Sequence, residues 1–284
     1  LKTKRALITG ITGQDGAYLA SFLVKEGYEV FGGCRKKVSN NRLWRLKELG
    51  IEKEIKIKLF DLLDENNINR VIRDGKYDEI YNLAAQSYVD KSFVSPLYTS
   101  NVNTLGVIRI LEALRKLSKS TKFYQASSSE MYGNTGSRAQ DENTTFKPIS
   151  PYAISKLHAH RMQKIYREVY NLYCCSGILF NHDSPLRSNE FVSKKIVSEL
   201  VRVKYRKTKY LYLGNIYAKR DWGYAKDYVE AMWKMLQQKT PSDYVISTGK
   251  QFTVKQFVNL VLKELKIDFK WKGKGIKEKC FDRD

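Results

Sequence analysis

Strand-like apolar runs alternate with helix-like stretches over the first 180 residues, and this alternation limits the folds that the chain can adopt. It predicts an α/β fold, a Rossmann-like doubly wound parallel sheet with helices on both faces. The strand-like runs are 5–9, 29–33, 55–60, 79–83, 122–126 and 173–179, and the helix-like stretches include 17–26, 101–117 and 152–170.

The rhythm changes beyond Asn181, where helix-like stretches mix with shorter strand-like segments. The helix-like stretches are 191–204, 223–238 and 253–265, and the strand-like segments include 209–213 and 244–247. We expect a Rossmann domain over 1–180 that also takes in the helix over 223–238, and a smaller mixed lobe over 181–284 that binds the substrate.

A glycine-rich loop lies between the first strand and the first helix, the context in which such a loop binds a dinucleotide. Gly10 would allow the tight turn, Gly13 would let the backbone approach a pyrophosphate, and Gly16 would let the helix pack closely on the sheet. Free amides at the helix start would bind phosphate oxygens. The predicted cofactor loop is Gly10, Thr12, Gly13, Gln14, Asp15 and Gly16, and an ordinary glycine-rich turn is the alternative.

Basic residues follow the second strand, where NAD-selective folds usually place an acidic residue for the ribose hydroxyls. The residues are Arg35, Lys36 and Lys37. A cationic cluster suits the 2′-phosphate of NADP, and Arg35 is the best candidate because its guanidinium can bind phosphate with two hydrogen bonds. We therefore predict NADP as the cofactor, with a solvated basic loop as the alternative.

The ends of the third and fourth strands should line the same ligand crevice. The small residues at 84 and 85 would let a cofactor lie against the backbone, although simple packing would explain them too. The residues expected at the crevice are Asp61, Leu62 and the segment 83–87, and those expected to contact the cofactor are Asp61, Leu62, Leu83, Ala84, Ala85 and Ser87.

The pattern Y-x-x-x-K occurs twice, at Tyr152–Lys156 and at 205–209. Tyr152 follows Ser150-Pro151, which predicts the first turn of a helix, with Lys156 one turn later on the same face. The second match lies in a run of basic residues without such a setting, and we interpret it as surface. A nearby ammonium would stabilise the Tyr152 phenolate, which could then take a proton from a sugar hydroxyl.

A serine run followed by a glutamate closes the fifth strand. If the strand continues, Ser128 and Glu130 point to the same face and enter the site together. An oxidoreductase needs the hydroxyl, whereas a dehydratase also needs a base for a carbon-bound proton and an acid for a departing hydroxyl. The pair favours dehydration, and a C4 oxidase or epimerase stays the alternative.

Composition narrows the class of protein. The net charge of +21 allows a nucleic-acid binder, but the basic residues are spread along the chain, so we expect no nucleic-acid partner. No apolar run approaches the roughly 20 residues of a membrane span. The cysteines form no C-x-x-C pair and the histidines lack zinc-site partners, so we expect a reduced, cytoplasmic protein without a metal. These residues are Cys34, Cys174, Cys175, Cys280, His158, His160 and His182.

Six stretches together resemble the GDP-mannose 4,6-dehydratases, a family of extended short-chain dehydrogenase type. They are ALITGITGQDGAYLA (6–20), YNLAAQSYV (81–89), FYQASSSEMYGN (123–134), SPYAISKLHAH (150–160), LFNHDSP (179–185) and YLGNIYAKRDWGYAKDYVEAMW (212–233). The resemblance implies a GDP-sugar substrate, bound NADP and a homodimer or homotetramer.

The resemblance also implies roles for individual residues. Ser128, Glu130, Tyr152 and Lys156 fall at the catalytic positions, and Tyr98, His182 and Arg187 at positions around the cofactor. The residues that fall where the nucleotide sugar is held are Ser87, Ser128, Glu130, Tyr152, Asn181, Lys195 and Arg220.

Three features depart from the family pattern. Ser128 stands where the family typically has Thr, which enlarges the pocket by a methyl group and leaves GDP-manno-heptose open beside GDP-mannose as the substrate. Leu186 stands where a second Arg commonly precedes Arg187, at a position linked to tetramer assembly. Family members also continue for tens of residues past position 284, so we expect the substrate lobe to be incomplete.

Overall fold

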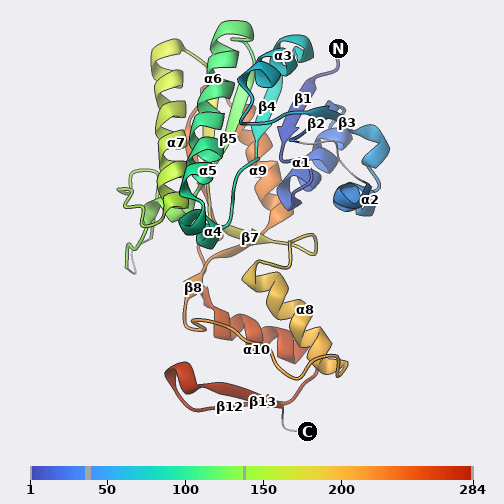
Figure 1. Ribbon diagram of the computed structural model, residues 1–284, viewed down its shortest axis with the longest axis vertical. Helices are drawn as coiled ribbons and strands as arrows, with labels where there is room; N and C mark the ends of the chain where they lie inside the picture. Colours follow the sequence, from blue (N-terminus) through green and yellow to red (C-terminus); the bar gives the residue numbers. More distant parts are fainter. Residues whose placement is uncertain (1, 36–39, 137–138, 283–284) are drawn as a thin grey trace. The chain divides into compact units, whose positions relative to one another are not determined.

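A computed structural model of the chain describes residues 2–35, 40–136 and 139–282 (Figure 1). The chain divides into two compact units, each made of separate stretches of sequence. Unit 1 comprises Leu1–His182 and Tyr224–Ile246, and unit 2 comprises Asp183–Gly223 and Ser247–Asp284.

Unit 1 contains a seven-stranded sheet in which every neighbouring pair is parallel. Its strands are β1 (Arg5–Thr9), β2 (Glu29–Cys34), β3 (Lys56–Leu59), β4 (Glu79–Asn82), β5 (Lys122–Ser128), β6 (Cys174–Leu179) and β10 (Asp243–Ile246). The spatial order is β10-β6-β5-β4-β1-β2-β3. The order reverses between β1 and β4, which confirms the predicted Rossmann-like, doubly wound sheet.

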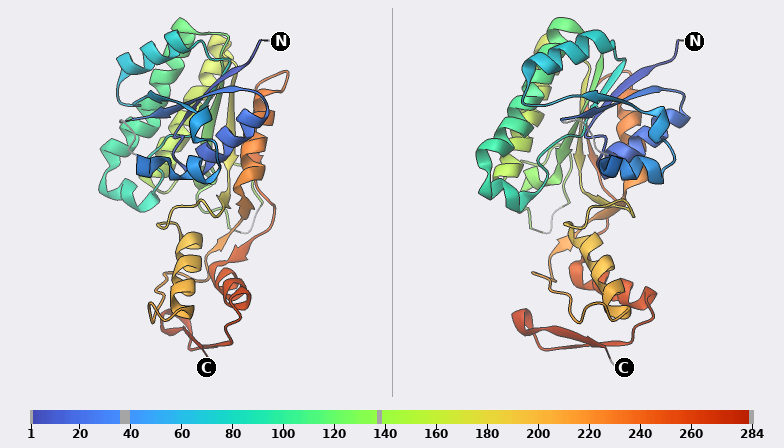
Figure 2. Two further views of the ribbon diagram at one scale, coloured as in Figure 1. Left: turned by 90° about the vertical axis from the view of Figure 1, so that its right-hand side faces the viewer. Right: turned by 45° about the vertical axis from the view of Figure 1, so that its right-hand side comes forward.

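Helices cover both faces of this sheet (Figure 2). One face carries α3 (Glu65–Gly75), α4 (Val89–Val94), α5 (Pro96–Ser100), the π-helical turn η3 (Asn101–Leu105), α6 (Gly106–Leu117) and α7 (Pro151–Tyr170). The other face carries α1 (Gln14–Lys25) and α9 (Ala225–Leu236), with α2 (Trp44–Glu48) near them. Short 3-10 turns complete the unit at η1 (Asn40–Leu43), η2 (Glu52–Glu54) and η4 (Ser129–Tyr132).

The central strands are apolar because both of their faces are covered. Leu7, Ile80 and Phe123 lie in three neighbouring strands and are fully buried against apolar side chains of α6, such as Ile110 and Leu111. Helix α7 begins as its sequence predicts: Pro151 occupies its first turn, and the Ser150 hydroxyl accepts a hydrogen bond from the Ala153 amide at 3.1 Å.

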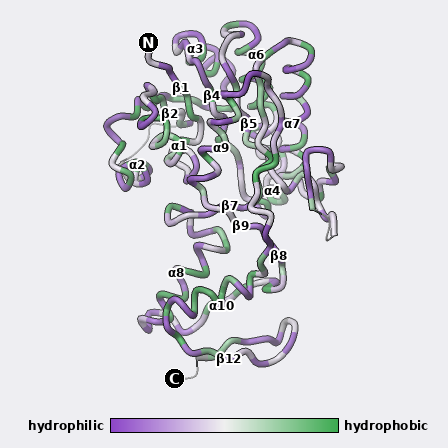
Figure 3. Tube along the Cα trace, turned by 180° about the vertical axis from the view of Figure 1, so that it is seen from behind, coloured by the Kyte–Doolittle hydropathy of each residue, from purple (hydrophilic) through white to green (hydrophobic). Residues whose placement is uncertain are grey.

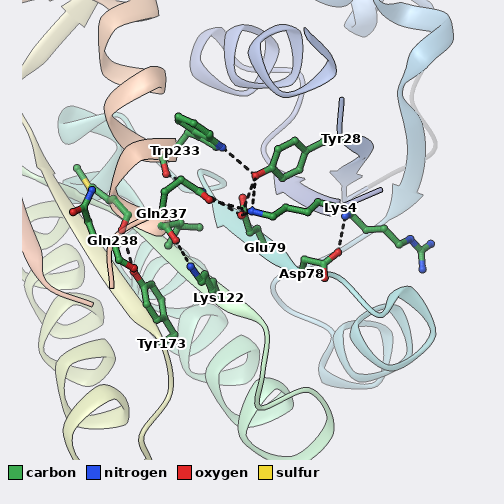
Figure 4. Close-up of polar contacts among 12 residues, drawn as sticks. Lys4, Tyr28, Asp78, Glu79, Lys122, Tyr173, Trp233, Gln237 and Gln238 are labelled. Carbon is green, nitrogen blue, oxygen red and sulfur yellow. Dashed lines mark hydrogen bonds and ion pairs between the residues drawn. The ribbon is translucent and has the colours of Figure 1, made fainter. Parts of the chain in front are cut away.

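A buried polar cluster joins α9 to the amino end of the sheet (Figure 4). The Glu79 side chain is 1% exposed and accepts hydrogen bonds from Lys4, Tyr28 and Gln237. The Tyr28 hydroxyl accepts from the Trp233 indole at 3.0 Å. These contacts hold α9 on the sheet at the end opposite the one where the strands finish.

Unit 2 is a smaller mixed unit. Its helices are α8 (Val192–Lys204) and α10 (Val254–Glu264), along which hydrophilic and hydrophobic residues alternate (Figure 3). Their buried side chains, among them Ile196, Leu200 and Val258, form its core. Its strands are β8 (Lys219–Arg220) paired with β11 (Phe252–Thr253), and β12 (Phe269–Lys272) paired with β13 (Lys279–Asp282), with the turn η5 (Gly275–Lys277) between the last two. Strands β7 (Asn181–Asp183) and β9 (Trp222–Tyr224) lie where the chain passes between the units.

Two sequence expectations differ from the structure. The segment 209–213 is not a strand: Leu211 and Leu213 pack on the core of unit 2 while Tyr210 and Tyr212 are exposed, so its alternation comes from packing without a neighbouring strand. The strand expected near 244–247 is β10, which pairs with β6 in the main sheet instead of lying in the smaller lobe. A short strand does not reveal from its own residues which sheet it joins.

Candidate active site

The glycine loop after β1 requires glycine for steric reasons. Gly10 has φ of +72°, and a Cβ at this position would lie 2.9 Å from the Ala84 nitrogen. A Cβ on Gly16 would lie 2.4 Å from the Gly10 carbonyl oxygen. Gly13 is the N-cap residue of α1 and offers no side chain to cap the helix, and the amides of such a helix start suit a phosphate group.

A pocket of about 480 Å³ lies at the carboxyl ends of the strands in unit 1. Eleven of the residues expected to bind the cofactor line it: Gly10, Thr12, Gly13, Arg35, Asp61, Leu62, Leu83, Ala84, Ala85, Ser87 and Tyr98. Its position at the reversal of strand order and its glycine-lined wall fit a dinucleotide.

The pocket also contains Gln86, from the segment after β4 that was expected at the crevice, and residues that were not predicted from the sequence: Gly33, Cys34, Arg42, Phe60, Tyr88, Lys91 and Val102. Position after a strand could have identified Gly33, Cys34 and Phe60. Arg42 and Lys91 lie outside any motif, and only the folding of their segments shows that they reach the pocket.

Three cationic side chains line the pocket: Arg35, Arg42 and Lys91. The Arg35 guanidinium donates a hydrogen bond to the Tyr98 hydroxyl, which brings together two residues expected near the cofactor. Lys36 and Lys37, also expected in this cluster, lie outside the described residues. Three cations in a pocket that also holds a glycine loop fit a dinucleotide with an additional phosphate.

Gln14, Asp15 and His182 form a cluster of their own beside the glycine loop. The His182 Nε2 atom lies 2.9 Å from an Asp15 carboxylate oxygen, and the Gln14 amide donates to the His182 carbonyl at 3.2 Å. The His182 ring stacks on Tyr228 with centroids 4.3 Å apart. Because these contacts fix the start of α1, the cluster supports the loop, although these three residues do not line the pocket.

The Tyr152–Lys156 pair lies in the first turns of α7, as predicted, and both side chains are buried. The Lys156 Nζ atom lies 5.9 Å from the centre of the Tyr152 ring and donates a 2.8 Å hydrogen bond to the carbonyl oxygen of Ala126 in β5. Burial lowers the pKa of Lys156 to about 8. An ammonium this close favours the charged form of a phenol.

Ser128 and Glu130 do not share a strand face, so the geometric premise for pairing them is wrong. Strand β5 ends at Ser128, and Glu130 lies in the 3-10 turn η4, where its amide donates to the Ser128 hydroxyl at 3.2 Å. Turn η4 packs against α7, the helix that carries Tyr152. The two residues are therefore held together by a turn, and the glycine-loop pocket includes neither of them.

The remaining expected residues have local partners. Asn181 is half-buried in β7. In unit 2, Arg187 forms an ion pair with Asp183 at 3.0 Å, the Lys195 ammonium donates to the Tyr212 carbonyl at 2.9 Å, and Arg220 is exposed in β8. Within the described ranges, no three His, Cys, Asp or Glu side chains gather as a metal site would require.

Fold and site together define a Rossmann-fold protein with a dinucleotide pocket and a buried Tyr–Lys pair. Solved structures agree on the fold. A dTDP-glucose 4,6-dehydratase from Streptomyces venezuelae has a TM-score of 0.82 at 22% identity, covering 93% of this chain and 82% of its own. A UDP-glucose 4-epimerase from Thermotoga maritima has a TM-score of 0.81 at 23% identity, covering 92% and 82%.

The chain belongs to the GDP-mannose 4,6-dehydratase family. The sequence model described as GDP-mannose 4,6 dehydratase matches residues 7–284. A protein of that name from Vibrio cholerae serotype O1 is 47% identical over 99% of this chain and 77% of its own length. Its counterpart from Drosophila melanogaster is 46% identical over 98% and 72%. The resemblance found in the sequence is thereby confirmed.

Burial of Lys156 predicts a pH-dependent stability. Its pKa is about 8 in the folded protein against 10.5 ordinarily, so between these values the unfolded chain binds more protons and stability rises with pH. Lys156→Met removes this term. We expect the variant's free energy of unfolding relative to wild type, measured by urea unfolding, to fall by about 1.4 kcal/mol per pH unit between pH 8 and 10.5 and to level off above that range.

Lys164→Met is the matched control, because Lys164 lies on the same helix and its side chain is 42% exposed. Its stability difference from wild type should not change over the same pH range. A constant difference for Lys156→Met as well would show that the ammonium is not held in a buried site.

Proposed function

We propose that the protein is a GDP-sugar 4,6-dehydratase that converts GDP-mannose to the GDP-4-keto-6-deoxy sugar, with bound NADP. The observation that carries the proposal is the buried Tyr152–Lys156 pair next to η4, the turn that holds Glu130 on Ser128. Membership of the family supports the nucleotide sugar as substrate. NADP, when bound, would supply the hydride acceptor for C4 of the sugar and the hydride donor for C6.

The residues of the chain move the protons. The phenolate form of Tyr152 takes the proton of the C4 hydroxyl, and the Lys156 ammonium stabilises that phenolate. We propose that the Ser128 hydroxyl hydrogen-bonds the same sugar hydroxyl. The resulting C4 ketone acidifies the proton on C5, which Glu130 removes; Glu130 then supplies a proton to the departing C6 hydroxyl. A proton adds to C5 as the hydride returns to C6, balanced by the proton that Tyr152 took at C4 and gives up again. Because the cofactor ends in its starting state, the reaction needs no external oxidant or reductant.

The binding roles follow the same plan. We propose that Gly10, Thr12, Gly13, Arg35, Asp61 and Ala84 contact the cofactor in the pocket. We assign the substrate diphosphate to basic side chains of unit 2, Lys195 and Arg220, with Asn181 as a further contact. GDP-mannose is the first choice of substrate, and the serine at 128 leaves GDP-manno-heptose as the alternative.

Mass spectrometry of the product tests the function. Purified protein given GDP-mannose without added NADPH should form a product that has lost one water and carries a 6-deoxy group. Glu130→Gln should keep C4 oxidation but lower water loss by a factor of roughly 10²–10⁴, as expected for a lost general acid–base.

Glu168→Gln is the control for that variant, because Glu168 is a 57% exposed carboxylate on α7 and should leave turnover unchanged. Full dehydration by Glu130→Gln would remove Glu130 from the mechanism. A product that keeps its C6 hydroxyl would favour a C4 oxidase or epimerase.

Cofactor selectivity gives a separate test. Arg35→Glu places a negative charge where the 2′-phosphate of NADP is proposed to bind. We expect affinity for NADP to fall by roughly 10²-fold or more while affinity for NAD changes little, measured by titration calorimetry. Arg73→Glu, an exposed site on α3, should change neither. Equal losses of NADP and NAD affinity with Arg35→Glu would show that Arg35 does not read the 2′-phosphate.

We further propose a cytoplasmic homodimer or homotetramer. Phe93, Val94 and Leu97 on α4 and α5 are 59%, 84% and 87% exposed, and such a patch is typical of an interface. Cys34, Cys174 and Cys175 are free thiols, which suits a reducing compartment. No helix described for residues 2–35, 40–136 and 139–282 has the length and apolar character needed to cross a bilayer. Sedimentation velocity at micromolar concentration measures the assembly, and a monomer would contradict it.

A further inference from the structure

A row of buried polar side chains crosses the sheet of unit 1 just below the pocket. It consists of Thr9 in β1, Asn82 in β4 and Gln125 in β5, which are direct neighbours in the register of the three strands. Each of these side chains is at most 2% exposed. We call these three residues the polar row.

The two ends of the polar row fix the direction of every hydrogen bond in it. At one end the Ala84 amide can only donate, and it donates to the Thr9 hydroxyl at 3.1 Å. That hydroxyl donates in turn to the Asn82 amide oxygen at 2.7 Å. The Asn82 amide nitrogen donates to the Gln125 oxygen at 2.8 Å, and the Gln125 nitrogen donates to the Ala126 carbonyl at 3.1 Å. Bonds aligned in this way polarise one another.

The polar row joins two parts of the proposed site. Ala84 lines the pocket, where its nitrogen is also the atom closest to a Cβ built on Gly10. At the other end, the Ala126 carbonyl oxygen accepts from both Gln125 and the Lys156 ammonium. The row thus runs from the backbone wall of the pocket to the hydrogen-bond acceptor of Lys156.

A role in stabilising the core alone does not explain why these three positions are polar. Apolar side chains fill neighbouring positions of the same strands, such as Ile8 and Phe123, and a polar row in a core is often no more stable than an apolar one. What an apolar row could not do is fix the carbonyl that receives a buried ammonium. Burial lowers the pKa of Lys156 because it disfavours the charged form. A buried ammonium therefore needs a hydrogen-bond acceptor, and the position of that acceptor sets the position of the ammonium.

We propose that Gln125 is a positioning residue for Lys156, and that the polar row connects the pocket wall at Ala84 to the lysine that acts on Tyr152. Gln125 holds the Ala126 carbonyl in place, and the carbonyl holds the ammonium one helical turn from the phenol. This inference rests on the proposed function, in which Tyr152 is the base.

Gln125→Met keeps the length of the side chain and removes its donor. We expect kcat to fall about tenfold with KM for the nucleotide sugar within about twofold, because the loss falls on a proton-transfer step and not on binding. The acid limb of the kcat–pH profile should move up by about one unit, since a displaced ammonium stabilises a phenolate less.

Gln163→Met is the matched control. Gln163 is also fully buried and accepts one hydrogen bond, from Ser176 at 2.7 Å, but it lies two turns beyond Lys156 on α7. It should lose stability without moving the pH profile. A Gln125→Met protein with an unshifted profile would reduce the polar row to a structural role.

The far end of the row gives a second variant that does not alter β5. Thr9→Val keeps the shape and removes the hydroxyl, so it should shift the profile in the same direction by a smaller amount. Thr9→Ser keeps the hydroxyl and should restore the wild-type profile. Identical profiles for Thr9→Val and Thr9→Ser would overturn the connection to Ala84.

A readout without turnover separates this inference from the proposed function. Competitive acetylation by a trace of acetic anhydride, followed by mass spectrometry across pH, reports the titration of Lys156 whatever the substrate is. Gln125→Glu places a carboxylate oxygen at the acceptor of the ammonium and should raise the labelling midpoint by about one pH unit or more. An unchanged midpoint would refute the coupling, whereas a wild-type protein that forms no dehydrated product would refute only the function.

Discussion

The reversal of strand order between β1 and β4 is the constraint on which the rest of the site depends. Where the connections that follow two neighbouring parallel strands run to opposite faces of the sheet, a crevice opens between them. Here the glycine loop after β1 and the segment after β4 form its two walls. The walls approach so closely that a Cβ on Gly10 would lie 2.9 Å from the Ala84 nitrogen. A side chain at position 10 would therefore collide with the backbone of the opposite wall.

The Tyr–Lys pair lies in the first turns of α7, and neither residue is among those that line the pocket. Helix α7 begins beside the end of β5 because Ser150 caps it and Pro151 suits its first turn. This places Lys156 in a buried position where one carbonyl receives its ammonium and where burial lowers its pKa to about 8. A buried lysine with a pKa of about 8 can stabilise a phenolate as an ammonium, yet its pKa lies close to neutral pH. This suits a tyrosine that must take and return a proton in one turnover.

Much of this was accessible from the sequence because it depends on local rules. Period and glycine spacing predicted the sheet and the loop, and the serine–proline start predicted where Tyr152 and Lys156 would lie. The errors arose where long-range pairing decides the outcome. The segment 209–213 alternates apolar and polar residues as a strand does, but no strand forms there. Strand β10 pairs with β6, which precedes unit 2 in the sequence, so its place in the sheet depends on a long-range contact.

The candidate site shows the same division. The sequence predicts Glu130 in a strand, but the strand ends at Ser128, whose hydroxyl accepts a hydrogen bond from the Glu130 amide. The spacing of residues alone does not reveal this interaction. Arg42 and Lys91 reach the pocket from segments without a motif. The hydrogen bonds of the polar row, which join Thr9 to Gln125, depend on strand order and were beyond reach from the chain alone.

The central claim is that one active site removes a hydride from C4 and returns it to C6 of the same sugar. The direct measurement is a crossover experiment with GDP-mannose carrying deuterium at C4, mixed with GDP-mannose that carries carbon-13 throughout the sugar and no deuterium. The account predicts deuterium at C6 of the carbon-12 product and none on the carbon-13 product. Deuterium lost to solvent, or shared between the two products, would contradict it.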